Sequence, residues 1–97
     1  MPTNEKPILR FSYPFDERTA HEATSRGYWG HSFVELLDGR THPVVFYDAV
    51  RLAQDLQEEG LQGRPFIAER GMVVVQSITL RNMTIAVERL ASEGFFA

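Results

Sequence analysis

The chain of 97 residues contains no cysteine, and it has no apolar run long enough to cross a bilayer. Without cysteine there is no disulfide, no thiol nucleophile and no zinc–thiolate or iron–sulfur site. The stretch 1–6 is polar and lacks the apolar core of a signal peptide. We therefore expect a cytoplasmic protein that does not interact with membranes.

Clustered basic side chains are also missing. The chain has a single lysine, and its arginines occur singly beside acidic or apolar neighbours. The formal net charge is -3, and the isoelectric point is about 5.5. Nucleic-acid-binding proteins take much of their affinity from clustered lysine and arginine. The charge pattern therefore argues against a nucleic-acid partner and leaves an RNA-associated role as the weakest hypothesis.

Motifs for common enzymatic functions are absent as well. The glycines are dispersed and form neither G-x-G-x-x-G nor a P-loop. No serine lies in a G-x-S-x-G elbow, and His21-Glu22 lacks the second histidine of an H-E-x-x-H zinc motif. These absences exclude the usual nucleotide-binding and hydrolase motifs. We assign no catalytic residue, no metal ligand and no cofactor.

The composition that remains is that of a small globular protein, with 43% hydrophobic and 24% charged residues. A chain of this length forms one hydrophobic core. We predict a disordered tail over residues 1–6 and a single α+β domain over residues 7–97.

The centre of the predicted fold is a β-hairpin between residues 28 and 47. Asp38-Gly39 is a strong hairpin signal, because a type I′ turn needs positive φ at both central positions. A two-residue loop would place Glu35 opposite His42, and it would place His31 opposite Phe46.

Three helices surround this hairpin in the prediction. A weak helix begins after the N-cap Asp16 and ends at Gly27, and a second helix begins after Asp48. A third helix follows Thr79. The apolar face of the second helix comprises Ala49, Leu52, Ala53 and Leu56.

Short strands complete the expected sheet. Residues 7–14 alternate between apolar and polar side chains, and residues 66–77 favour two strands around Glu69-Arg70-Gly71. The run "MVVV" at 72–75 is typical of a central strand covered on both faces. The overall expectation is an α+β domain with a largely antiparallel sheet, a central hairpin and two main helices packed on one face. The terminal "FFA" is expected to fold back onto the core.

Candidate binding residues lie on or beside the hairpin. Paired in the expected register, His42 and Glu35 could bind a metal or supply a general base, with His31 on the same face. The alternative is an ordinary cross-strand polar pair. Aromatic side chains flanked by glycines and an arginine on the next helix add a recognition surface. The full set is Tyr28, Trp29, His31, Glu35, His42, Tyr47 and Arg51.

Two hypotheses for the function follow. The first is a non-enzymatic protein–protein interaction module that binds a second copy of the chain or another protein, through an exposed strand or the aromatic surface near Trp29. The second is a domain that binds a small molecule or metal, or a minor enzyme, that uses the histidine, glutamate and aromatic residues of the hairpin.

Overall fold

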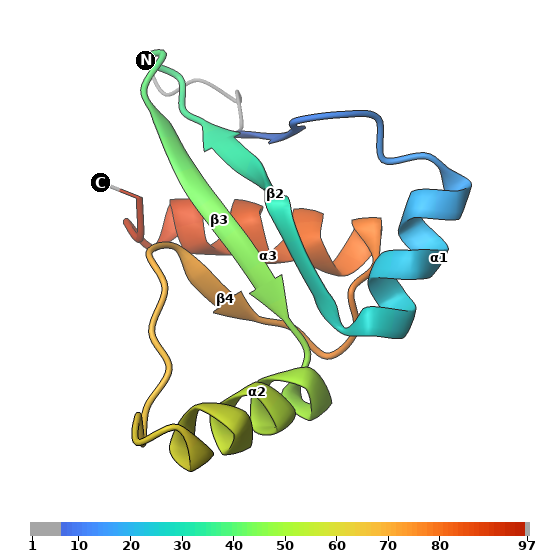
Figure 1. Ribbon diagram of the computed structural model, residues 1–97. Coiled ribbons are helices and arrows are strands. Elements are labelled where there is room, and N and C mark those ends of the chain that lie inside the picture. The colour runs from blue at the N-terminus through green and yellow to red at the C-terminus, as the bar shows by residue number, and fades with distance from the viewer. Residues whose placement is uncertain (1–6, 97) are drawn as a thin grey trace.

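The computed structural model describes residues 7–96, so the tail predicted for residues 1–6 lies outside the described part of the chain. Four strands form one mixed sheet in the order β1-β2-β3-β4. They are β1 (Ile8–Phe11), β2 (Tyr28–Glu35), β3 (Thr41–Tyr47) and β4 (Met72–Val74). The first three are antiparallel and β4 is parallel to β3. Figure 1 shows β2 and β3 as the long central pair, which confirms the α+β class and the central hairpin.

The hairpin register differs from the expected one by one residue. The N–H of Leu36 donates to the carbonyl oxygen of Arg40 at 2.8 Å and closes a loop of three residues, in which Gly39 has a φ of 88°. Three-residue loops of this kind end in a left-handed residue, a role that glycine fills without strain. Glu35 therefore lies opposite Thr41, and His42 lies opposite Val34. The prediction that His42 faces Glu35 is wrong.

A second irregularity lies in β2 between Trp29 and Ser32, where the register shifts by one more residue. Gly30 sits within this bulge, and the hydroxyl of Tyr28 occupies the space that a Cβ at Gly30 would need. The bulge lets Trp29 and Phe46 pair on the buried side of the sheet, where both side chains join the core. The expected pairing of His31 with Phe46 does not form.

Three helices accompany the sheet: α1 (Glu17–Arg26), α2 (Ala49–Leu61) and α3 (Leu80–Ser92). The expected N-caps are confirmed, because Asp16, Asp48 and Thr79 each accept a hydrogen bond from the backbone N–H three residues later. The first helix ends at Gly27 in the left-handed conformation, as predicted.

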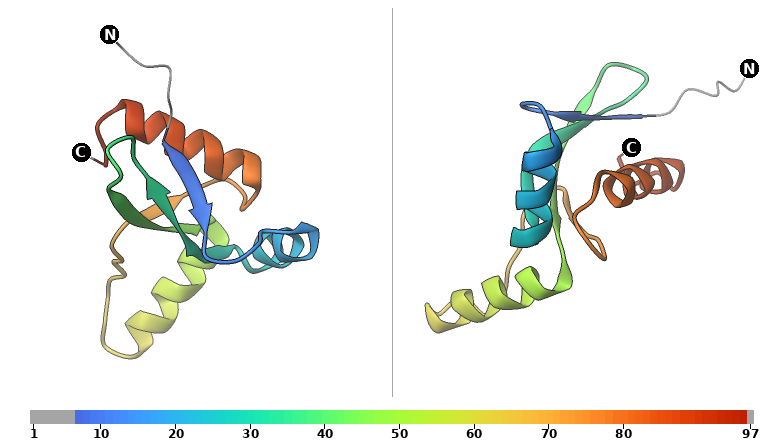
Figure 2. Two further views of the ribbon diagram at one scale, coloured as in Figure 1. Left: turned by 90° about the horizontal axis from the view of Figure 1, so that it is seen from above. Right: turned by 90° about the vertical axis from the view of Figure 1, so that its right-hand side faces the viewer.

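The core lies between α3 and one face of the sheet. Val34, Val44 and Phe46 are fully buried on the sheet side, and Met83 and Val87 are buried on α3. Phe96 packs into this core, as expected of the terminal segment, whereas Phe95 remains 52% exposed and Ala97 lies outside the described residues. Figure 2 shows α3 on one side of the sheet and α2 leaving its end on the other side.

Two expectations for the second half of the chain are wrong. Every side chain of α2 is exposed or only partly buried, so this helix does not pack on the sheet beside α3. Of the two strands expected between residues 66 and 77, the described structure contains only β4, and it lies at the edge of the sheet rather than in its centre. Among the described strands none lies beyond β4, and the side chain of Val74 is exposed. No helix of the described residues is long and apolar enough to cross a membrane.

Gly71 marks the closest backbone approach next to β4. Its φ is 75°, and a Cβ there would meet the carbonyl oxygen of Pro43. Gly63 has a similar φ of 86° with open space around it. A substitution there therefore introduces backbone strain without a steric clash. We expect Gly63→Ala to cost about 1 kcal/mol in the free energy of unfolding. Gly71→Ala is expected to cost at least about 2 kcal/mol, because the steric clash adds to that strain.

Urea unfolding of the two variants measures both values. Equal losses of stability at the two glycines would show that β3 and β4 do not approach as closely as the structure has them.

Candidate functional site

Trp29 belongs to an aromatic cluster at the edge of the core. Its side chain is 7% exposed, and its ring lies 5.0 Å from Phe15 and 6.2 Å from Phe11, measured between ring centroids. Tyr13 and His31 cover its outer side at 6.0 Å and 5.4 Å. The indole N–H is buried without a hydrogen-bond partner among the described residues. Trp29 thus fills space between β2 and the segment before α1, while Tyr13 and His31 form the exposed rim.

Glu35 and His42 lie on opposite faces of the hairpin. Directly opposed residues of antiparallel strands project to the same side, so His42 shares the core side with Val34. The ring of His42 lies 5.9 Å from that of Phe96, and its Nε2 is buried without a partner in the described part of the chain. Glu35 instead accepts a hydrogen bond of 2.9 Å from Nε of Arg10. Among residues 7–96, no three His, Asp or Glu side chains are grouped as a metal site would require.

Tyr28, Tyr47 and Arg51 do come together, on the face of the sheet opposite α3. The two tyrosine rings are 4.9 Å apart, and the guanidinium of Arg51 lies 5.4 Å from the ring of Tyr28. Arg51 also donates to Asp55 at 2.9 Å and to the carbonyl oxygen of Arg26 at 3.1 Å. These contacts attach the first turns of α2 to β2 and to the end of α1.

Tyr47 is the most buried member of this group, at 3% exposure, and its hydroxyl donates a hydrogen bond to Oε1 of Glu69. Burial and this hydrogen bond raise the pKa of Tyr47 far above its ordinary value, and burial also raises the pKa of Tyr28. Both phenols therefore stay protonated at neutral pH. Tyr47 acts as a hydrogen-bond donor that ties the loop after α2 to the end of β3.

A polar cavity of about 300 Å³ lies beside this contact. It contains four carboxylates and one guanidinium, and Arg64 already pairs with Glu59 at 2.9 Å. The lining residues come from β3, α2 and the following loop: Tyr47, Asp55, Glu58, Glu59, Gln62, Arg64, Ile67, Ala68 and Glu69. Several of these polar groups bond within the protein, Tyr47 to Glu69, Glu59 to Arg64 and Asp55 to Arg51.

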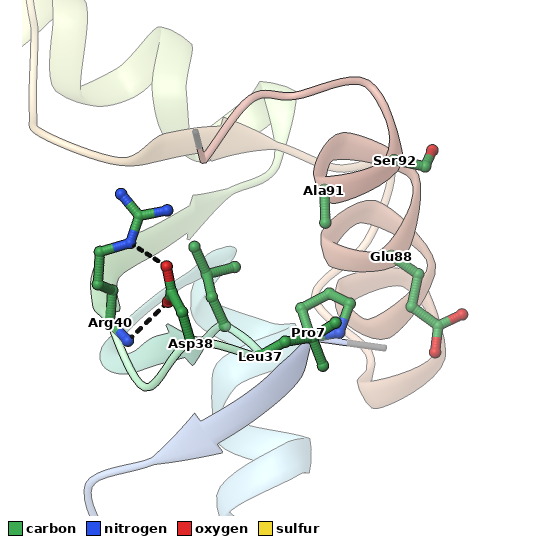
Figure 3. Close-up of a pocket in the computed structure, with 8 residues that line it drawn as sticks. Pro7, Leu37, Asp38, Arg40, Glu88, Ala91 and Ser92 are labelled. Atoms are coloured by element: carbon green, nitrogen blue, oxygen red, sulfur yellow. Dashed lines mark hydrogen bonds and ion pairs between the residues drawn. The ribbon is translucent and has the colours of Figure 1, made fainter. Parts of the chain in front are cut away.

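A larger, mostly apolar cavity of about 500 Å³ lies between the hairpin loop and the C-terminal half of α3 (Figure 3). Leu37 and Pro7 form part of its wall, and Ala91 borders it from α3. Its most prominent polar pair is already satisfied, because Asp38 accepts two hydrogen bonds from Arg40, at 2.6 and 3.0 Å. None of the residues singled out from the sequence lines this cavity.

The surface that sequence reasoning missed is the outward side of α2. Arg51, Asp55 and Glu59 are partly buried on the side facing the rest of the protein, together with Leu52. The opposite side is exposed and carries no charge except that of Glu58 at its margin, where Gln54 is also exposed. We call it the α2 outer face, and it comprises Ala49, Val50, Ala53, Leu56, Gln57, Gly60 and Leu61.

The large members of the α2 outer face are strongly exposed: Val50 by 68%, Leu56 by 41% and Leu61 by 82%. Phe66, in the loop that follows, is also exposed. The apolar periodicity of residues 49–60 was visible in the sequence, but we expected it to pack on the core. The helix is turned the other way, with its polar side inward.

The pKa of Tyr47 gives a pH-dependent stability. A tyrosine whose pKa is higher in the folded than in the unfolded state stabilises the fold fully below about pH 10, and this contribution declines as the pH rises further. We expect the free energy of unfolding to fall with alkaline pH and Tyr47→Phe to reduce that slope. At neutral pH the same variant should lose about 0.5–1.5 kcal/mol with the hydrogen bond to Glu69. Urea unfolding between neutral and alkaline pH tests both effects, and an unchanged slope would show that this phenol is not buried.

Comparisons with known proteins identify no relative. No protein-family model matches the chain, and neither a curated protein nor a solved structure matches it at a significant level.

Proposed function

We propose that the protein is a non-enzymatic protein-binding module and that its docking surface is the α2 outer face. The observation that carries this proposal is the exposure of three large aliphatic side chains, Val50, Leu56 and Leu61, on one side of one helix.

The energetic argument concerns the cost of leaving this face in water. Covering a large aliphatic side chain gains about 1.5–3 kcal/mol relative to leaving it fully exposed. A helix of a monomeric protein normally directs its apolar side to the core. Here the charged side chains Arg51 and Asp55 take that place, and an uncharged side faces outward. An apolar side that none of residues 7–96 covers is typical of an interaction surface.

The orientation of α2 is fixed by contacts on its inner side. Arg51, which also pairs with Asp55 one turn along the same helix, donates to the carbonyl oxygen of Arg26 and lies against the ring of Tyr28. The hydroxyl of Tyr47 holds the loop that follows the helix through Glu69. Rolling the apolar side inward would break these contacts and bury the charges. The exposed face is therefore a property of how the helix is attached.

Protein contact at this face can be tested by photo-crosslinking. A photoreactive phenylalanine analogue replaces Leu61 in the cells that make the protein, and a matched variant carries it in place of Ile85. Ile85 is 47% exposed on α3, far along the chain from α2. We expect position 61 to form covalent adducts with a protein identified by mass spectrometry, because a docked partner covers this side chain. Position 85 should form none.

The control is a second substitution on the same face. Leu56→Glu should abolish the adducts at position 61, while the free energy of unfolding changes by less than about 0.5 kcal/mol, because Leu56 lies outside the core. Adducts of equal amount at positions 61 and 85, or adducts that persist in the Leu56→Glu background, would refute docking at this face.

A further inference from the structure

We propose that the α2 outer face binds a second copy of this chain, with the two α2 helices antiparallel across a twofold axis. This inference rests on the proposed function and names the partner for the same surface. It depends on the pattern of side chains along the outer face, on the charges at the two ends of the helix and on the area available.

The first argument is the spacing of residues along the face. Ala49, Ala53, Leu56 and Gly60 follow one another at intervals of four, three and four residues. This alternation is that of the a and d positions of a coiled coil, which bring one helix alongside another over several turns. All four residues are exposed, so a second helix can pack along this line.

The second argument is self-complementarity. In an antiparallel pair, one twofold axis places Ala53 of each helix opposite Leu56 of the other. The same axis places Ala49 opposite Gly60 at both ends. Large side chains therefore meet small ones at the centre, and small ones meet at the ends, so the backbones can approach closely. Val50 and Leu61 lie beside this seam and would cover its margins. An isologous interface needs this kind of match, because one surface must fit itself.

The third argument is charge. Glu58 and Glu59 occupy the last turn of α2, although the C-terminal end of a helix favours positive charge. Arg51 and Glu59 lie on the inner side of α2 and pair with Asp55 and Arg64, so the exposed charge at the end of the helix is that of Glu58. An antiparallel pair sets this negative C-terminal end of each helix level with the positive N-terminal end of the other helix dipole. A parallel pair would set the two acidic ends together, which is repulsive.

The area indicates how tight the dimer can be. The 13 residues of α2 make a helix about 20 Å long, so one contact along its side is small compared with a standard specific interface. We therefore expect a weak, reversible dimer.

Single cysteines test both the contact and its direction, because the natural chain has none. Ala53→Cys and Leu56→Cys are purified separately, mixed and oxidised under mild conditions. We expect the mixed disulfide between the two variants to dominate, since the antiparallel pair brings these positions within bonding distance. Ile85→Cys serves as the matched control and should form no preferred disulfide. A dominant disulfide between two Leu56→Cys chains would indicate a parallel pair and overturn the proposal.

Sedimentation equilibrium of the unmodified protein gives the independent measurement. Leu56→Glu should raise the dissociation constant by more than about 100-fold, because each dimer would bury two unpaired carboxylates. Ala53→Leu should also weaken the dimer, because two large side chains then collide. The double variant Ala53→Leu/Leu56→Ala exchanges large and small and should restore dimerisation. Circular dichroism of each variant confirms that the monomer remains folded.

The outcomes separate this inference from the proposed function. A chain that stays monomeric up to millimolar concentration overturns the second-copy proposal. If position 61 still crosslinks to a different protein in cells, the protein-binding function stands and its partner is heterologous. If position 61 also forms no specific adduct, both proposals fail.

Discussion

The junction at Asp48 determines the direction in which α2 leaves the sheet, and the exposed surface of the protein depends on that direction. The backbone N–H of Asp48 donates to the carbonyl oxygen of Gly27, and its carboxylate accepts from the N–H of Arg51 to cap α2. That carboxylate fills the position that a Cβ at Gly27 would take, and Gly27 has a φ of 71°. The end of α1 and the start of α2 are thus held together at Gly27 and Asp48, which sets the point and the direction from which α2 leaves the sheet.

The magnitudes explain why such a helix is suited to a partner. The two ion pairs that involve α2, Arg51–Asp55 and Arg64–Glu59, are partly exposed, and pairs of this kind contribute about 0–1 kcal/mol each. Covering Val50, Leu56 and Leu61 would gain more than these pairs together. The inner contacts therefore orient the helix. Most of the free energy that covering its apolar side chains can contribute is gained only when a partner binds.

Local signals in the sequence predicted the local structure well. Each helix begins after its expected N-cap, because the capping hydrogen bond depends on one side chain and the backbone N–H three residues later. Asp38-Gly39 predicted the hairpin because a tight turn needs a positive φ, which is also a local property of these residues. Its register was not, because Gly39 can end a loop of three residues as well as one of two. Because the loop is one residue longer than expected, His42 lies on the opposite face from Glu35 and the expected polar pair does not form.

Features that depend on distant contacts could not be predicted in this way. At Gly30 the hydroxyl of Tyr28 occupies the space of a Cβ and the register with β3 shifts, and no local pattern in the sequence indicates either. The apolar run at 72–75 resembles a buried central strand, although β4 is an edge strand whose Val74 faces outward. Periodicity showed that α2 has an apolar side, but it contains no information on what covers that side. Of the residues singled out beforehand, the structure gathers Tyr28, Tyr47 and Arg51 into one contact, and this contact positions the helix.

Three surfaces of this protein can be compared as sites of association: the edge strands, the aromatic cluster around Trp29 and the α2 outer face. The edge strands are short, at four residues in β1 and three in β4, and short edges make poor templates for a further strand. The aromatic cluster around Trp29 uses its largest ring inside the core, so only its rim could touch a partner. The seven residues of the α2 outer face carry no charge, and Figure 2 shows that α2 projects away from the sheet. Association through this helix would also leave the core and both sheet edges unchanged, so a weak dimer could form and separate without unfolding either copy.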